Sequence, residues 1–207
     1  LFPYTTLFRS DLGIWKFLSQ SRYGGRCEIF QTGKVSGHIH EYDINSSYPS
    51  AMQSKQFPNL DTMQRGKTIT DLNKAGVAMC TVKCPPMEFP LLPFKENKES
   101  KLLFPYGTFQ GTWTYAELRK AIELKYTILD VHDSVEYDVM PSPFQPYIDF
   151  LYGRRMEVKG KDELMSYTLK IFMNALFGKW GEEGELQVIS RGKRYTMNQV
   201  PKHSNMI

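Results

Sequence analysis

The fold is decided by the stretch Lys170-Ile171-Phe172-Met173-Asn174-Ala175-Leu176-Phe177-Gly178. From Leu169 to Phe177 only Lys170 and Asn174 are polar, and we predict one helix here, capped by Asp162 and ending at Gly178. Residues four apart share a helix face, so Lys170 and Asn174 form a narrow polar stripe with Phe177 one turn further on. A solvated face normally carries more charge, and the pattern therefore favours a groove that faces a ligand.

A second helix is predicted directly before the first, over residues 144–159, because Pro141-Ser142-Pro143 precedes it and Gly160 interrupts it. So short a connection predicts an antiparallel helix pair. The earlier helix carries three cations: Arg154, Arg155 and Lys159. They could lie along a solvated basic face. If they point instead into one cleft with Lys170, each can hydrogen-bond phosphate oxygens, worth about 1.5–3 kcal/mol apiece.

Far upstream lies a second informative stretch, Asp43-Ile44-Asn45-Ser46-Ser47-Tyr48-Pro49-Ser50. Strands are predicted over 27–30 and 38–44, across a turn at 31–37, and a helix is predicted from Pro49 through Met52. An aspartate followed by serine often only forms a turn. At the end of a strand, however, the Asp43 carboxylate would be exposed where a divalent metal could bind, and the bulk of Tyr48 could reject a sugar 2′-hydroxyl.

Between the two stretches the pattern predicts a small α+β subdomain. Strands are expected over 77–84 and 126–137, and a helix over 114–124 with Leu118 and Ile122 on its apolar face. Prolines between 85 and 105 and a charge run over 95–101 indicate loops.

Composition sets broad bounds. The chain has 207 residues, of which 41% are hydrophobic, which argues against general disorder. Lys and Arg number 26 against 22 Asp and Glu, a net charge of +4 that suits a polyanionic partner without requiring one. No apolar stretch is long enough for a membrane span. The three cysteines, Cys27, Cys80 and Cys84, are an odd number without a paired spacing, which predicts reduced thiols in a cytosolic setting. A zinc site at Cys80-x-x-x-Cys84 is disfavoured because no second Cys/His pair lies near it.

Both chain ends are expected to be arbitrary. Residues 1–10 look like a translated sequencing adapter and are set aside. Residues 186–207 are expected to begin a strand or hairpin without reaching a domain end. Near the start, Arg22-Tyr23-Gly24-Gly25-Arg26 is either an ordinary turn or a place where the backbone approaches a ligand closely.

Together these residues resemble the family B DNA polymerases, and more narrowly their protein-primed branch of phages, adenoviruses and linear plasmids. Residues 43–50 match the family's first palm motif and residues 170–178 its fingers motif. Gly24-Gly25 is similar to the branch's linker motif, and residues 77–137 to the insertion that contacts the priming protein and DNA.

The resemblance implies a role for each matched position. Asp43 would bind two Mg²⁺ ions with the carbonyl of Ile44, and Lys170 would neutralise the triphosphate with Arg155 and Lys159. Tyr48 would be the sugar gate, with the backbone near Ser47 touching the triphosphate, while Asn174 and Phe177 would flank the nascent base pair. Contacts to DNA are implied for Ser46, Gly24, Gly25, Gly178 and Lys179. The implied partners are template and primer DNA, deoxynucleoside triphosphates and a terminal priming protein, with no membrane.

Three matched positions depart from the family pattern: Ser47 replaces a leucine, Ala175 a serine and Phe177 a tyrosine. In the linker motif, Arg22-Tyr23-Gly24-Gly25 shifts the expected tyrosine by one residue. The family's Tyr-x-Asp-Thr-Asp motif is missing, since Asp130-Val131-His132-Asp133-Ser134 has the wrong spacing and precedes the fingers. We therefore expect a catalytically inactive fragment, viral or plasmid-encoded. Two alternatives stay open: a family B polymerase that starts from RNA or DNA primers, and a non-catalytic nucleic-acid-binding remnant.

The expected fold class is α+β, a partial polymerase palm with an inserted α+β subdomain and an antiparallel helical fingers pair. The expected segments are 11–60 for the linker motif and first palm part, 61–140 for the insertion, 141–185 for the fingers, and 186–207 for the returning palm.

Overall fold

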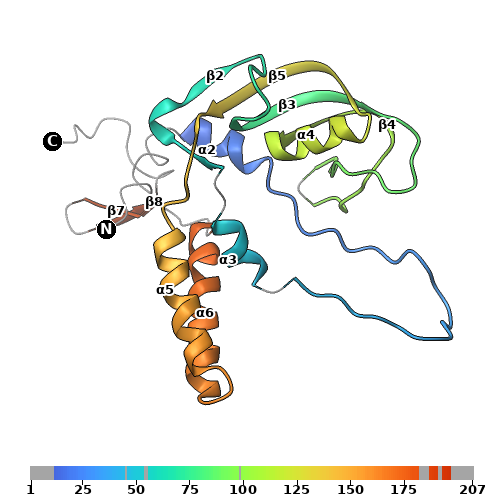
Figure 1. Ribbon diagram of the computed structural model, residues 1–207. Coiled ribbons are helices and arrows are strands. Elements are labelled where there is room, and N and C mark those ends of the chain that lie inside the picture. The colour runs from blue at the N-terminus through green and yellow to red at the C-terminus, as the bar shows by residue number, and fades with distance from the viewer. Residues whose placement is uncertain are drawn as a thin grey trace. The chain divides into compact units, whose positions relative to one another are not determined.

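The computed structural model describes residues 12–44, 46–53, 56–97, 99–181, 187–190 and 193–196, the last two ranges and 177–181 as backbone. The chain divides into two compact units (Figure 1). The first contains the described parts of 1–44 and 53–143, and the second those of 45–52 and 144–207. The mixed helix and sheet content confirms the α+β expectation.

The first unit is built on a four-stranded antiparallel sheet with strand order β2-β5-β3-β4. Its strands are β2 (Gln64–Gly66), β3 (Ala75–Cys84), β4 (Gly107–Thr114) and β5 (Thr127–Tyr137). The central pair β3 and β5 shifts register twice, between Met79 and Cys80 and between Thr81 and Val82. Beside the sheet, β1 (Phe57–Pro58) pairs with β6 (Val139–Met140), and a 3₁₀ turn (η1) spans Leu60–Thr62.

Successive side chains of β3 enter two different cores. Ala78, Cys80 and Val82 pack with α4 (Tyr115–Glu123), whereas Val77 packs with Phe17 of α2 (Leu12–Ser19). Because neighbouring side chains of a strand point to opposite faces, α4 and α2 cover opposite faces of the sheet. Helix α2 is held on the sheet by the burial of Phe17, which is 4% exposed.

Helix α4 begins with a capping box. Thr114 Oγ1 accepts a hydrogen bond from the Glu117 amide, and the Glu117 carboxylate accepts one from the Thr114 amide, which satisfies two otherwise unpaired donors. The buried face consists of Tyr115, Leu118 and Ala121. Ile122 lies on the same side of the helix as Tyr115 and Leu118, as the spacing predicts, but in the last turn of α4 it is 42% exposed, so the core does not cover this end of the apolar face.

The two strands predicted over 27–30 and 38–44 are not formed. Residues 22–44 contain no helix or strand, and Ile29, Ile39 and Tyr42 are 81%, 78% and 90% exposed. A strand needs a neighbour to satisfy its backbone hydrogen bonds and to cover one face. Within the described part of the chain, none of the sheets includes such a neighbour for this segment.

The second unit consists of α3 (Ser47–Met52), α5 (Gln145–Val158), α6 (Glu163–Gly181) and a hairpin. Helices α5 and α6 pack together, and Gly160, with φ of +78°, makes the turn between them. Asp162 caps α6 by accepting a hydrogen bond from the Met165 amide at 2.9 Å. The predicted end at Gly178 is wrong, because α6 continues to Gly181. A glycine permits a helix end but does not impose one.

The hairpin joins β7 (Gln187–Ser190) to β8 (Lys193–Thr196) in antiparallel register, as expected of this region. Among the helices that the structure describes, none has the length and apolarity that a membrane crossing requires.

Candidate functional site

The second unit brings the two informative stretches of sequence together. Helix α3, which carries Ser47 and Tyr48, contacts both α6 and α5. It is held there by Pro49 and Met52, which are buried, while Tyr48 keeps 52% of its surface exposed. Residues more than a hundred positions apart in sequence therefore share one small helical body, with a tyrosine at its surface.

Lys170 and Asn174 lie on one face of α6, as the spacing predicts. Lys170 is exposed and Asn174 half-buried, whereas Met173 beside them is fully buried in the helical core. Lys170 makes no hydrogen bond or ion pair with any residue that the structure describes. The antiparallel register is marked by Tyr147 of α5, whose hydroxyl donates to the carbonyl of Phe172 at 3.2 Å. Within the described part of the chain, Lys170 is thus an exposed, unpaired cation on α6.

The three cations of α5 differ in their surroundings. Arg154 pairs with Glu157 at 2.7 Å on the surface, where such pairs contribute little. Arg155 is half-buried, and its Nε atom is buried without a hydrogen-bond partner among the described residues. Lys159 is exposed at the end of α5. Arg155 therefore does not fit a solvated basic face, since a buried N–H without an acceptor costs free energy.

Asp43 and Ile44 belong to the first unit, and both are exposed. A carboxylate and a backbone carbonyl are the hard oxygen donors that Mg²⁺ prefers. Asp43 has no hydrogen-bond or ion-pair partner in the described ranges, so its oxygens are available. Those ranges contain no cluster of three or more His, Cys, Asp or Glu side chains able to hold a metal. The donors thus fit part of a magnesium site but do not complete one.

Ser46 adopts a left-handed conformation, with φ of +51°, directly before α3. Its carbonyl accepts the hydrogen bond from the Ser50 amide at 2.9 Å, the first bond of that helix. Such a conformation is costly for a residue other than glycine and is maintained only where its surroundings demand it. The strain lies inside the stretch that the sequence singles out.

The remaining predicted positions, Gly24, Gly25, Gly178 and Lys179, lie in two different parts of the chain. Gly24 and Gly25 lie exposed in the extended segment, and a Cβ atom on either would meet nothing within 4 Å. Within the described chain, therefore, no backbone approaches them closely. Gly178 and Lys179 are part of α6. The side chains of Phe177 and Lys179 fall outside the described residues.

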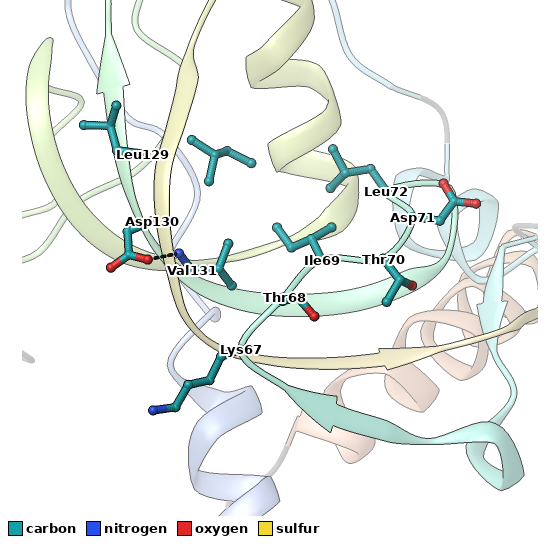
Figure 2. Close-up of a pocket in the computed structure, with 10 residues that line it drawn as sticks. Lys67, Thr68, Ile69, Thr70, Asp71, Leu72, Leu129, Asp130 and Val131 are labelled. Carbon is teal, nitrogen blue, oxygen red and sulfur yellow. Dashed lines mark hydrogen bonds between the residues drawn. The ribbon is translucent and has the colours of Figure 1, made fainter.

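A pocket that sequence analysis did not predict lies in the first unit (Figure 2). It has a volume of about 660 Å³ and is lined by residues 67–72 and 128–131. Ile69 and Leu72 line it from the loop and Leu129 and Asp130 from β5, where Asp130 accepts a hydrogen bond from the Val131 amide at 2.9 Å. It contains none of the predicted site residues, and nothing in its scattered polar groups indicates a specific ligand.

The chain belongs to the type B DNA polymerases of the organellar and viral group, whose family model matches residues 6–197. This confirms the family B resemblance. A protein described as a probable DNA polymerase from Ascobolus immersus is 29% identical over 170 residues, which cover 79% of this chain and 14% of that protein. The DNA-directed DNA polymerase of Enterobacteria phage PRD1 is 39% identical over 49 residues, 24% of this chain and 9% of that protein.

Solved structures give the same fold. The Phi29 DNA polymerase complexed with primer-template DNA matches 93% of this chain and 38% of its own, with a TM-score of 0.60 and 17% identity. An orthorhombic crystal form of Phi29 DNA polymerase matches 76% of this chain and 31% of its own, with a TM-score of 0.55 and 16% identity. The chain thus spans less than two thirds of the length of each of these four relatives.

Proposed function

We propose that this chain is part of a DNA-directed DNA polymerase that joins deoxynucleotides to a primer 3′-hydroxyl during DNA replication. One observation carries the proposal: the helix that presents Tyr48 packs on the helix pair that presents Lys170, within a single unit. A triphosphate held by Lys170 would then lie in the same body as a ring able to screen its sugar. The PRD1 and Phi29 relatives, named as DNA polymerases, support the same activity.

Each side chain receives a distinct task. Lys170 neutralises phosphate charge, and Arg155 and Lys159 add positive charge on the neighbouring helix. Asn174 and Phe177 lie further along α6, where they would contact the new base pair. Tyr48 blocks a 2′-hydroxyl by its bulk. The backbone N–H groups near Ser47, at the exposed start of α3, are suited to donate hydrogen bonds to an anion.

Asp43 and the Ile44 carbonyl would contribute to a magnesium site, and two ions bound there would supply charge stabilisation for displacement at the α-phosphorus. Since one carboxylate cannot hold two ions, we propose that the chain alone does not extend a primer. The polymerase that contains it would provide the other ligands, consistent with the 14% of the Ascobolus protein that the chain covers.

We further propose that the polymerase is of the protein-primed kind, in which a protein hydroxyl serves as the first primer. The support is the four-stranded subdomain with α4, which lies between the two motifs where that branch carries its insertion. A polymerase that starts from nucleic-acid primers would need no terminal protein. Initiation assays with and without the replicon's terminal protein separate the two kinds.

The direct test is primer extension by the full-length polymerase that contains this segment, alongside the 207-residue chain alone. We expect extension by the former, its loss in Asp43→Asn, and no extension by the latter. Sequencing the source DNA beyond both ends identifies the full-length enzyme and shows whether a Tyr-x-Asp-Thr-Asp motif follows in frame. Salt-dependent DNA binding by a full-length protein without extension would instead support the non-catalytic alternative.

A further inference from the structure

Arg26, directly after Gly24-Gly25, is contacted by protein groups on several sides, although 30% of its side chain stays exposed. Its Nε and Nη2 atoms donate to Glu28 Oε2 at 2.8 Å and 2.6 Å, and its Nη1 atom donates to the carbonyl of Pro90 at 2.6 Å. The flat guanidinium lies 4.2 Å from the centre of the Phe104 ring. Carboxylate, carbonyl and ring together engage both the edges and a face of this side chain.

The contacts of Arg26 join two parts of the chain that are distant in sequence. Pro90 and Phe104 belong to the proline-rich loop, residues 85–106, between β3 and β4. Phe30 adds a second contact to that loop by packing edge to face on Phe89, with ring centres 5.1 Å apart. On the other side of the glycines, Tyr23 packs against the α4 core. Burial raises the pKa of the Tyr23 hydroxyl. Gly24-Gly25 is thus a two-residue bridge attached at both ends.

We propose that Arg26 is a positioning residue, which fixes the exposed Gly24-Gly25 bridge on the proline-rich loop and does not itself bind nucleic-acid phosphate. The proposal rests on the proposed polymerase function, in which this segment contacts DNA. Three N–H donors of Arg26 are already directed at Glu28 and the Pro90 carbonyl, and the Glu28 carboxylate offsets its charge, which disfavours a role as a phosphate ligand. The bridge itself is unobstructed, since a Cβ atom on either glycine meets nothing within 4 Å.

The contacts of Arg26 with Glu28, the Pro90 carbonyl and Phe104 form a clamp. Glu28→Gln gives the sharpest test, because it adds one unit of positive charge and weakens this clamp. If charge alone governs DNA binding, affinity for a single-stranded oligodeoxynucleotide should rise; if the clamp positions the segment, affinity should fall by at least ~threefold. Glu41→Gln is the matched control, since Glu41 is exposed in the same segment and makes no ion pair with a described residue. It should bind at least as tightly as the wild type.

Arg26→Lys and Arg26→Ala complete the design, measured by fluorescence anisotropy of the 207-residue chain over a salt series. The clamp predicts equal losses for both variants, because lysine keeps the charge but lacks the planar fork. It also predicts an unchanged salt slope, whereas loss of a phosphate ligand lowers the slope by about 0.7. A coupling of at least ~threefold between Arg26→Ala and Phe104→Leu should appear in a double-mutant cycle.

Several results would overturn the proposal: tighter binding by Glu28→Gln, full retention of affinity by Arg26→Lys, a reduced salt slope in Arg26→Ala, or no binding by the wild-type chain. Thermal melts of all variants separate lost positioning from lost folding, since the α4 core does not include Arg26. Primer extension by the full-length enzyme tests the polymerase function separately. If extension is observed, each of these results would overturn only the role proposed for Arg26.

Discussion

The hydroxyl of Tyr115 donates a hydrogen bond to Glu136 Oε2 at 3.1 Å inside the first unit, where the two residues are 0% and 3% exposed. The same carboxylate accepts hydrogen bonds from the amide and the hydroxyl of Thr70. It also forms an ion pair with Lys74 at 3.2 Å. A buried charge is tolerated only when it is paired and hydrogen-bonded in this way. Glu136 therefore ties the loop before β3 to the sheet and to α4.

Glu136→Gln should lower the free energy of unfolding by about 2–4 kcal/mol at neutral pH, because it leaves several buried donors poorly matched. Urea unfolding measures the change. Glu123→Gln is the control, since Glu123 and its partner Lys120 are both more than half exposed and the pair should contribute little. Equal stability of Glu136→Gln and the wild type would show that the network does not stabilise the unit.

The same carboxylate predicts a pH dependence. Burial by itself raises the pKa of Glu136, but the hydrogen bonds from Thr70 and the contacts with Lys74 and Tyr115 outweigh it, and the net pKa is lowered. A carboxyl whose pKa is lowered by folding stabilises the protein above its unfolded pKa of about 4.3, and the stabilisation is lost as the pH falls through the folded value. Stability should therefore decline in acid more steeply for the wild type than for Glu136→Gln.

Gly111→Ala should destabilise the first unit by about 1–3 kcal/mol, the usual cost of overpacking. A Cβ atom at Gly111 would lie 2.5 Å from the ring of Trp113, which is fully buried and donates its indole N–H to the carbonyl of Pro93 at 2.9 Å. Gly153→Ala on α5 is the control, because nothing lies within 4 Å of its Cβ position. It should instead stabilise its helix by about 1 kcal/mol. Thermal unfolding compares the two.

Arg155→Met should increase the stability of the fold and weaken nucleotide binding. The buried Nε atom has no hydrogen-bond partner in the described structure, so an apolar side chain of similar length should raise the free energy of unfolding by about 1 kcal/mol. Loss of the cation should raise the KM for nucleotides in the full-length polymerase. A variant that is both less stable and fully active would contradict this account of Arg155.

Lys170→Ala should lower kcat/KM for deoxynucleotides in the full-length polymerase, because it removes a charge-assisted contact. The decrease should correspond to a loss of about 1.5–3 kcal/mol of transition-state stabilisation. Unfolding should be unaffected, since Lys170 is exposed and makes no described ion pair. Lys161→Ala, in the turn between α5 and α6, controls for the loss of one charge. Single-turnover kinetics measures both variants. An unchanged kcat/KM in Lys170→Ala would show that Lys170 does not bind the nucleotide.

Local elements could be read from the sequence because the signals for them are local. The capping pair Thr114 and Glu117, the break at Gly160 and the apolar period of α6 act within one or two helical turns. The alternating residues of 27–44 mislead for the opposite reason, because a strand depends on a neighbour that local sequence does not specify. The pocket beside β5 was missed since it combines residues 67–72 and 128–131, which no local motif links.

The sequence by itself determined the family resemblance, and the spacing of Lys170 and Asn174 and the string from Asp43 to Ser50 predict a triphosphate and a metal before any coordinates are known. Only the tertiary structure decided that α3 packs with α5 and α6, and that Arg26 is bound to Glu28 and Pro90. The packing of α3 and the contact between Arg26 and Pro90 join segments distant in the chain. They depend on burial and on hydrogen bonds made only after the chain is folded, and no local pattern records them.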